Sequence, residues 1–215
     1  KGTLYDSGIQ TPLIAVWPGR IPQGMVHQNG LISTIDLAPT FLELAGIEKP
    51  AFMFGSSLLP QMKDPSAPGR DIIFAERNWH NTDEYMRCLR TEKYKFIINR
   101  YPELLHGTPS ELSSSPSWFS LRRNLRDGTL DHAQAMLFDC PRAAIELYDI
   151  QADPWETRNL AEEEGYKELI EDLGRKLKQW QQTTADHPSY LRRMTDETDR
   201  VTGYPLPMPA EKIPD

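Results

Sequence analysis

The chain has 215 residues, of which 39% are hydrophobic and 26% are charged, so it can bury the core of one large domain or one and a half. Its net charge of −7, with acidic and basic residues interspersed, argues against nucleic acid or an anionic membrane as the main partner. No apolar run approaches the roughly 20 residues that a membrane-spanning helix needs. An anionic sugar remains compatible with this composition, because a small pocket can be locally basic.

The chain begins with a polar, glycine-containing stretch that leads into a short apolar run, Pro12 to Trp17, closed by a Pro-Gly turn. This pattern predicts a strand buried on both faces. Open α/β sheets carry their ligands on loops at the edges of such strands, and Lys1 stands just ahead of this one. A soluble protein rarely starts so abruptly with a core strand, so we expect the sequence to be the C-terminal part of something longer.

A helix is predicted next, because Ser33 to Asp36 forms a pattern like a capping box, with Asp in place of the usual Glu. Pro39 falls in the first turn, apolar residues follow at helical spacing, and Gly46 closes the helix. The loop 48–70 is rich in proline and glycine. We place a domain boundary there, so that residues 1–62 form the end of an α/β domain.

The second domain, residues 63–186, is predicted to be α+β with a small antiparallel sheet. Strands are expected at 72–75, 86–91, 94–99 and 145–150, and the middle two form a hairpin. A long insertion, residues 100–143, is expected to hold one or two short helices within 117–138.

Two helix signals follow the last strand. Asp153 to Glu156 combines an N-cap Asp, a Pro at N1 and a Glu at N3, which predicts a helix start. From about 166 to 182 an apolar stripe predicts a helix that covers one face of the sheet. We expect Trp155 and Trp180 in the core of this domain. Residues 187–215, rich in proline, are predicted to form an extended tail.

Several charged residues, the two cysteines and the histidines are expected to have structural roles. Arg90, Lys93 and Lys95 are expected on the solvent side of the hairpin. Cys88 and Cys140 are expected to be buried thiols, although a disulfide between them stays open. The histidines have no spacing typical of metal ligands, so no metal site is predicted in this chain.

The residues of the first stretch resemble a known signature. Lys1-Gly-Thr-Leu-Tyr-Asp-Ser-Gly-Ile-x-x-Pro12 is similar to the second signature of the type I sulfatases, K-x-T-x-Y-E-G-G-x-x-x-P, with Asp6 and Ser7 in place of Glu and Gly. Further matches follow in family order as far as residue 186, among them Ser33-x-x-Asp36-x-x-Pro39-Thr40 and Glu146-Leu-Tyr-Asp-x-x-x-Asp153-Pro-x-Glu156. The last run looks most like the N-sulfoglucosamine sulfohydrolases, which cleave the sulfamate of glucosamine in heparan sulfate.

The resemblance implies an α/β, alkaline phosphatase-like sulfatase fold. The chain would supply the last strand–helix part of the large α/β domain and a smaller C-terminal subdomain, a four-stranded antiparallel sheet packed on a long helix. The family's nucleophile, a formylglycine made from a C/S-x-P-x-R motif, and its calcium ion are both expected upstream. Neither the motif nor a calcium-binding cluster is recognisable here, so this segment alone is expected to be inactive without the missing N-terminal sulfatase domain.

The resemblance also suggests site residues. The family lysine that corresponds to Lys1 contacts the sulfate, whereas the sequence without the motif would suggest a mobile terminal lysine. His80, Asp83, Glu84 and Arg87 form a polar cluster, expected on a loop after the first strand, and are candidates for binding the sugar. Arg87 would meet a carboxylate with both arms of its guanidinium. The alternative is an ordinary solvated loop.

The function predicted from these features is hydrolysis of sulfate esters or sulfamates of a glycan, such as a heparan-type saccharide. The alternatives are a phosphoester or phosphonate hydrolase of the same superfamily and a non-catalytic, glycan-binding relic of the fold. The family works in the periplasm, in the lysosome or outside the cell, and the segment contains nothing that selects among these locations.

Overall fold

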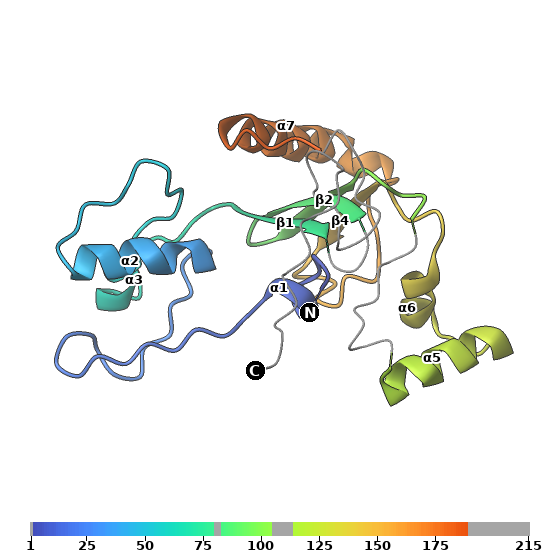
Figure 1. Cartoon of the computed structure of the whole chain (residues 1–215), viewed down its shortest axis with the longest axis horizontal. Coiled ribbons are helices and arrows are strands. Elements are labelled where there is room, and N and C mark those ends of the chain that lie inside the picture. Colours follow the sequence, from blue (N-terminus) through green and yellow to red (C-terminus); the bar gives the residue numbers. More distant parts are fainter. Residues whose placement is uncertain (1, 80–82, 105–113, 189–215) are drawn as a thin grey trace, which may run out of the picture.

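A computed structural model of the chain describes residues 2–79, 83–104 and 114–188. A small lobe with two helices is joined to a larger lobe built around a β-sheet (Figure 1). The elements in order are α1 (Asp6–Ile9), η1 (Thr34–Asp36), α2 (Leu37–Leu44), α3 (Leu59–Lys63), β1 (Ile73–Trp79), β2 (Asp83–Arg90), β3 (Tyr94–Asn99), α5 (Pro116–Asp127), α6 (His132–Ala135), η2 (Met136–Phe138), β4 (Ile145–Asp149), η3 (Glu164–Tyr166) and α7 (Lys167–Thr183).

The larger lobe contains an antiparallel sheet with the strand order β1-β2-β3-β4. The predicted hairpin is confirmed as β2 and β3, in which Cys88 pairs with Ile97 and Leu89 with Phe96. Because side chains alternate along a strand, Leu89 and Phe96 share one face of the sheet while Cys88 and Ile97 share the other. Both faces are covered, so β2 is buried along nearly its whole length.

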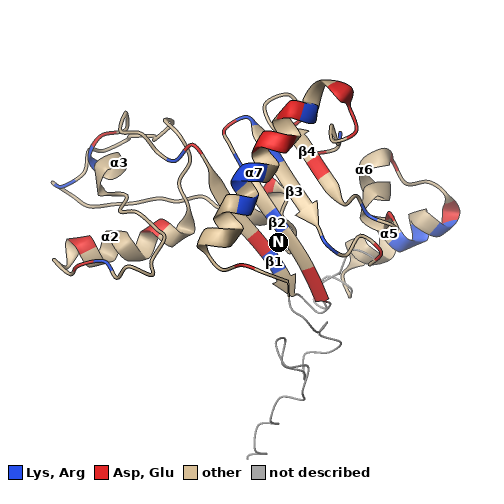
Figure 2. Cartoon of the chain, turned by 90° about the horizontal axis from the view of Figure 1, so that it is seen from above, with Lys and Arg blue, Asp and Glu red and all other residues tan. Residues whose placement is uncertain are grey.

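The long helix α7 covers the first of these faces, as predicted. Leu173 and Leu177 pack against Leu89 and Phe96 in one apolar cluster, to which Trp180 also belongs. The ring of Trp180 stacks on Phe74 of β1, with the ring centroids 4.9 Å apart. Figure 2 shows that the outward side of α7 carries acidic and basic residues, as expected for an amphipathic helix on a core.

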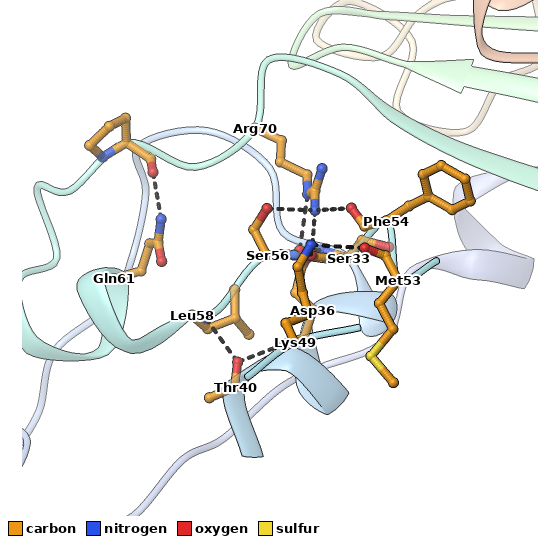
Figure 3. Close-up of polar contacts among 12 residues, drawn as sticks. Ser33, Asp36, Thr40, Lys49, Met53, Phe54, Ser56, Leu58, Gln61 and Arg70 are labelled. Atoms are coloured by element: carbon orange, nitrogen blue, oxygen red, sulfur yellow. Dashed lines mark hydrogen bonds and ion pairs between the residues drawn. The ribbon is translucent and has the colours of Figure 1, made fainter. Parts of the chain in front are cut away.

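The small lobe depends on the carboxylate of Asp36, the residue that ends the predicted capping box. The capping box is present, and the Asp36 side chain accepts from the backbone N–H of Ser33 at 3.0 Å and of Ser56 at 2.8 Å. Arg70 donates to the same carboxylate from Nε at 3.1 Å and from Nη2 at 2.5 Å (Figure 3). These contacts connect the start of α2 with the loop before α3 and with the segment that leads into β1.

Two predicted elements are absent from the described residues. Residues 12–17 form no strand, and Ile14 and Val16 are 86% and 83% exposed. A strand exists through its ladder of hydrogen bonds, and the described chain offers this run no partner strand. The apolar pattern was therefore recognised correctly, but the buried strand assigned to it was wrong for this structure.

The predicted helix start at Asp153 is also wrong. Its carboxylate does accept backbone N–H groups, from Thr157 at 2.7 Å and Arg158 at 2.8 Å, but these contacts close a turn. Glu156 adopts a positive φ of 55°, which interrupts any helix, and its side chain is buried. Trp155 is 83% exposed and not in the core, whereas Trp180 is in the core as predicted.

The two cysteines do not form a disulfide. Cys88 is buried, as expected, and Cys140 is exposed, contrary to expectation. The insertion before β4 contains short helices, α5 and α6, within the region where they were predicted.

The packing of α7 gives a first prediction. Replacing Leu177 by Ala should lower the free energy of unfolding by about 2–5 kcal/mol, because Leu177 is 1% exposed and its removal leaves a cavity against the sheet. The exposed neighbour Lys178 provides the control, and its replacement by Ala should change stability by less than about 0.5 kcal/mol. Urea denaturation followed by tryptophan fluorescence would measure both, and equal effects would contradict the packing described.

The Asp36 network gives a second prediction, on pH. Burial alone would raise the pKa of Asp36, but the hydrogen bonds from Arg70, Ser56 and Ser33 outweigh it and hold the pKa below its ordinary value. A carboxyl whose pKa is lower in the folded state stabilises the protein above its unfolded pKa, and this stabilisation is lost as the pH falls through the folded pKa.

Unfolding free energies measured from about pH 6 down to about pH 2 should therefore fall more steeply for the natural protein than for Asp36→Asn. The Asn variant should also be less stable by about 2–3 kcal/mol at neutral pH, since hydrogen bonds to a charged group are lost. The exposed Asp71→Asn variant should behave like the natural protein. Parallel curves for the natural protein and Asp36→Asn would refute the role given to this carboxylate.

Candidate functional site around the signature segment

The candidate site is built on residues 2–9, here called the signature segment, which lie against the face of the sheet opposite α7 (Figure 1). Leu4 is 4% exposed and joins Cys88 and Ile97 in the apolar cluster on that face. Within the segment, α1 is a single helical turn that ends at Ile9. A Cβ on Gly8 would lie 2.4 Å from Thr3 Oγ1 and 2.5 Å from Thr3 O, so this position of the motif requires glycine.

Two tyrosines bind one buried carboxyl beside this segment. Tyr5 donates its hydroxyl to Glu146 Oε2 at 2.9 Å, and Tyr148 donates to the same atom at 2.8 Å. The two rings meet edge to face, with centroids 5.9 Å apart. Burial raises the pKa of Glu146 and of both tyrosines, so the phenols keep the protons that they donate. This contact attaches the segment to β4.

A cluster of charges forms the second attachment, and we call Asp6, Arg90, Lys95 and Glu156 the charged cluster. Lys95 Nζ lies 2.6 Å from Asp6 Oδ1 and 2.6 Å from Glu156 Oε1. Arg90 Nη2 lies 3.2 Å from Asp6 Oδ2. The backbone N–H of Asp6 donates to Glu156 Oε2 at 2.5 Å. Four groups from three distant parts of the sequence therefore meet on the signature segment.

The charged cluster corrects the expectation that Arg90 and Lys95 face solvent. The side chain of Lys95 is 0% exposed and that of Arg90 is 13% exposed, whereas Lys93, at the turn, is 50% exposed as predicted. Lys95 shares a face of β3 with Ile97, two residues on, and that face is covered by the signature segment. Sequence reasoning treated the hairpin as one-sided and so missed Lys95, although a single lysine within an apolar strand was the available signal.

The environment shifts the pKa values of Asp6 and Glu156 in opposite directions. Burial alone would raise the pKa of Asp6, but hydrogen bonds from Lys95 and Arg90 outweigh it and lower that pKa. For Glu156 burial dominates, and its pKa is raised in spite of Lys95. Sequence reasoning had used Glu156 as a helix-start residue and had not given it, Glu146 or Tyr148 a role at a site.

The structure describes Asp83, Glu84 and Arg87 among the residues that were proposed from the sequence for substrate contact. Lys1 and His80 lie outside the described residues. Asp83, Glu84 and Arg87 belong to β2 and not to a loop, because β1 and β2 both run further than expected. All three are buried. Their part in binding a substrate stays a prediction.

Both Glu84 and Arg87 have protein partners. Glu84 Oε2 lies 2.5 Å from Arg77 Nε, and Oε1 lies 3.5 Å from Arg142 Nη1. Arg87 forms a bidentate contact with a carboxylate, which was predicted for a substrate group, but this carboxylate is that of Asp186. Its Nε donates to Asp186 Oδ2 at 2.7 Å and its Nη2 donates to Oδ1 at 2.6 Å, which fastens the chain after α7 to the sheet.

A cavity of about 600 Å³ adjoins the signature segment, between the sheet and the insertion that precedes β4. Tyr5, Arg142, Glu146 and Tyr148 contribute polar groups to its wall. Within the described ranges no three His, Cys, Asp or Glu side chains gather in a way that would hold a metal ion, so the residues present do not fit a calcium site. No helix among the same residues is long and apolar enough to cross a membrane.

Comparison with known proteins agrees with the signature. The chain is 30% identical over 182 residues to an ulvan-active sulfatase of Formosa agariphila, which covers 84% of this chain and 30% of that enzyme. Together with the family-model match below, this similarity supports a C-terminal sulfatase segment. Within the family, residues 1–106 match the model described as N-sulphoglucosamine sulphohydrolase, C-terminal.

Human N-sulphoglucosamine sulphohydrolase is 28% identical over 198 residues, which cover 86% of this chain and 39% of that enzyme. Among solved structures, a sulfatase from Bacteroides thetaiotaomicron superposes on 70% of this chain and 25% of its own, with 22% identity and a TM-score of 0.44. The chain spans about a third of the length of the curated relatives that it matches along most of its own length.

The charged cluster gives a third prediction. Lys95→Met should lower the free energy of unfolding by about 3–5 kcal/mol, because it removes the buried cation between Asp6 and Glu156 and leaves the buried Glu156 without a cationic partner. Lys93→Met is the matched control on the same hairpin and should cost less than about 1 kcal/mol, since Lys93 is half-exposed and its contacts, with Asp149 and the Tyr94 ring, are at the surface. Urea denaturation of the two variants compares them directly, and a Lys95→Met protein as stable as the control would show that the cluster does not hold the fold together.

Proposed function

We propose that the chain is the C-terminal part of a sulfatase that hydrolyses sulfate esters or sulfamates of a glycan, and that heparan-type saccharides are the favoured substrate class. The observation that carries the proposal is the signature segment, whose residues 2–9 match the sulfatase motif and are fixed to the sheet by apolar and charged contacts. The matches to an ulvan-active sulfatase and to N-sulphoglucosamine sulphohydrolase support the same class.

In this proposal Lys1 binds the sulfate. An ammonium group next to a sulfuryl centre offsets the negative charge that grows on the sulfate oxygens and on the leaving atom during hydrolysis. Such stabilisation is effective when the donor is held in place before the reaction. The anchoring of the residues directly after Lys1 supports this role.

The groups that attack sulfur are proposed to lie in the rest of the enzyme. A formylglycine would supply the nucleophile and a calcium ion would bind the sulfate oxygens, with both held by residues outside this chain. The chain alone is then expected to show no sulfatase activity.

The small lobe supports the idea that the remainder of a sulfatase domain packs here. Large apolar side chains gather in residues 13–54 with high exposure, including Ile14 at 86%, Phe41 at 65% and Phe52 at 76%. Exposed apolar residues in such number mark a surface that another part of the protein covers. We propose that the missing N-terminal sulfatase domain covers it.

Recognition of the sugar is proposed for His80 and its neighbours Asp83, Glu84 and Arg87. Because Glu84 and Arg87 are paired with protein groups, direct contact with a sugar requires these partners to be exchanged. For localisation we propose the periplasm, the lysosome or the extracellular space.

A fourth prediction tests the function. In the full-length enzyme, Lys1→Ala should lower kcat on a sulfated heparan-type disaccharide by about 10²–10³-fold, the range for removal of one preorganised donor to a developing charge. The melting temperature should stay unchanged, and the exposed Lys63→Ala variant should keep natural kinetics.

The substrate panel should include N-sulfated and O-sulfated disaccharides and a phosphate monoester. Natural kinetics in Lys1→Ala would remove the role of this lysine. A natural enzyme that cleaved the phosphate monoester and none of the sulfated sugars would overturn the proposed function and favour a phosphohydrolase of the same superfamily.

A further inference from the structure

We propose that Glu156 and Lys95 are positioning residues for the sulfate-binding lysine, because they fix the segment that carries it without touching the substrate themselves. The inference rests on the proposed function of Lys1. It assigns a catalytic consequence to the charged cluster, in which Lys95 lies 89 residues after Asp6 in the sequence and Glu156 lies 150 residues after it.

Glu156 uses both of its carboxylate oxygens, one on the signature segment and one on Lys95. Oε2 accepts the backbone N–H of Asp6 at 2.5 Å, and Oε1 lies 2.6 Å from Lys95 Nζ. A contact to a backbone N–H fixes the path of the chain and not merely one side chain. Only a carboxylate offers two acceptor atoms in this arrangement, so Gln at this position keeps one contact and loses the other.

Lys95 and Glu156 are both buried, and burying charges is costly. The side chains of Lys95 and Glu156 are 0% and 2% exposed. Taking such ions out of water is costly, and apolar residues of the same size often stabilise a fold as well or better. A charged cluster on the same face of the sheet as Cys88 and Ile97 therefore contributes a defined geometry more than it contributes net stability.

The charged cluster lies only five positions after Lys1 in the sequence, at Asp6. Leu4 is buried on the sheet, Tyr5 is bound by Glu146, and Asp6 is bound by Lys95, Arg90 and Glu156. Only two residues of sequence separate Leu4 from Lys1. A shift of Asp6 is thus transmitted along a very short tether to the group that is proposed to meet the sulfate. Displacement of a catalytic group by about 1 Å can cost about 10²-fold in rate.

The test is a double-mutant cycle in the full-length enzyme between Glu156→Gln and Lys1→Ala, with kcat and KM measured on a sulfated heparan-type disaccharide. Glu156→Gln should lower kcat/KM about tenfold to a hundredfold when Lys1 is present. In the Lys1→Ala background the same change should cost less than about twofold, because a positioning residue has nothing left to position. Glu162→Gln, an exposed glutamate of the same region, is the matched control and should be neutral in both backgrounds.

A second readout follows Lys1 directly. Acetylation of the Lys1 amine, measured by mass spectrometry, should be slowed by inorganic sulfate in the natural enzyme and much less so in Glu156→Gln. Lys95→Arg, which keeps a cation in the cluster, should retain more activity than Lys95→Met. Circular dichroism and melting curves establish that each variant is folded, and Glu156→Gln replaces Lys95→Met where the latter is not.

The outcomes separate this inference from the proposed function. Unchanged kinetics in a folded Glu156→Gln enzyme, a loss of equal size in both backgrounds, or natural protection of Lys1 by sulfate in that variant would each overturn the positioning role and leave the sulfatase proposal intact. Natural kinetics in Lys1→Ala, or an enzyme that hydrolyses no sulfated sugar, would overturn the proposed function itself.

Discussion

The structure depends on one buried interaction, the contact of Lys95 with the carboxylates of Asp6 and Glu156. A lysine that is fully removed from water has to be compensated on the spot, and the two carboxylates at 2.6 Å do this. Asp6 belongs to the signature segment and Glu156 to the turn after β4. If either moved away, the buried ammonium of Lys95 would lose one of its two carboxylate partners. The segment, the sheet and the turn are thereby held as one unit.

The two faces of the sheet carry different tasks. The face under α7 is mainly apolar, and its cluster of leucines and aromatic rings forms the core between sheet and helix, with the Arg87–Asp186 pair on the same face. The opposite face mixes apolar residues with Glu146, Lys95 and their partners, and it carries the residues that match the sulfatase motif. The main apolar core of the lobe thus lies on one side of the sheet, and the candidate site lies on the other.

Much of this fold was predictable from local patterns. The hairpin of β2 and β3, the strand β4 and the helix α7 follow from alternation and from an apolar stripe, which act within a few residues of each other. The capping box that ends at Asp36 was equally local. The strand at 12–17 failed because a strand is defined by its neighbour, and the helix at Asp153 failed because Glu156 is drawn inward by Lys95, a residue far away in the sequence.

The candidate site was predictable only in part. The motif suggested Lys1, whose role stays a prediction, but the residues that hold the signature segment come from β2, β3, β4 and the following turn, and no spacing in the sequence links them. Lys95 in particular resembled a solvent-facing residue of a one-sided hairpin, because the element that covers it, the signature segment, lies about ninety residues earlier in the chain. Only the tertiary structure shows that the carboxyl of the motif and this lysine belong together.

The most direct test of the central claim is the distance between Lys1 Nζ and the nearest sulfate oxygen in a crystal structure of the full-length enzyme with a sulfated sugar bound. The account predicts a charge-assisted hydrogen bond of about 2.7–2.9 Å, with Asp6, Lys95 and Glu156 still in mutual contact behind it. A Lys1 amine that points away from the bound sulfate, with the cluster intact, would contradict it.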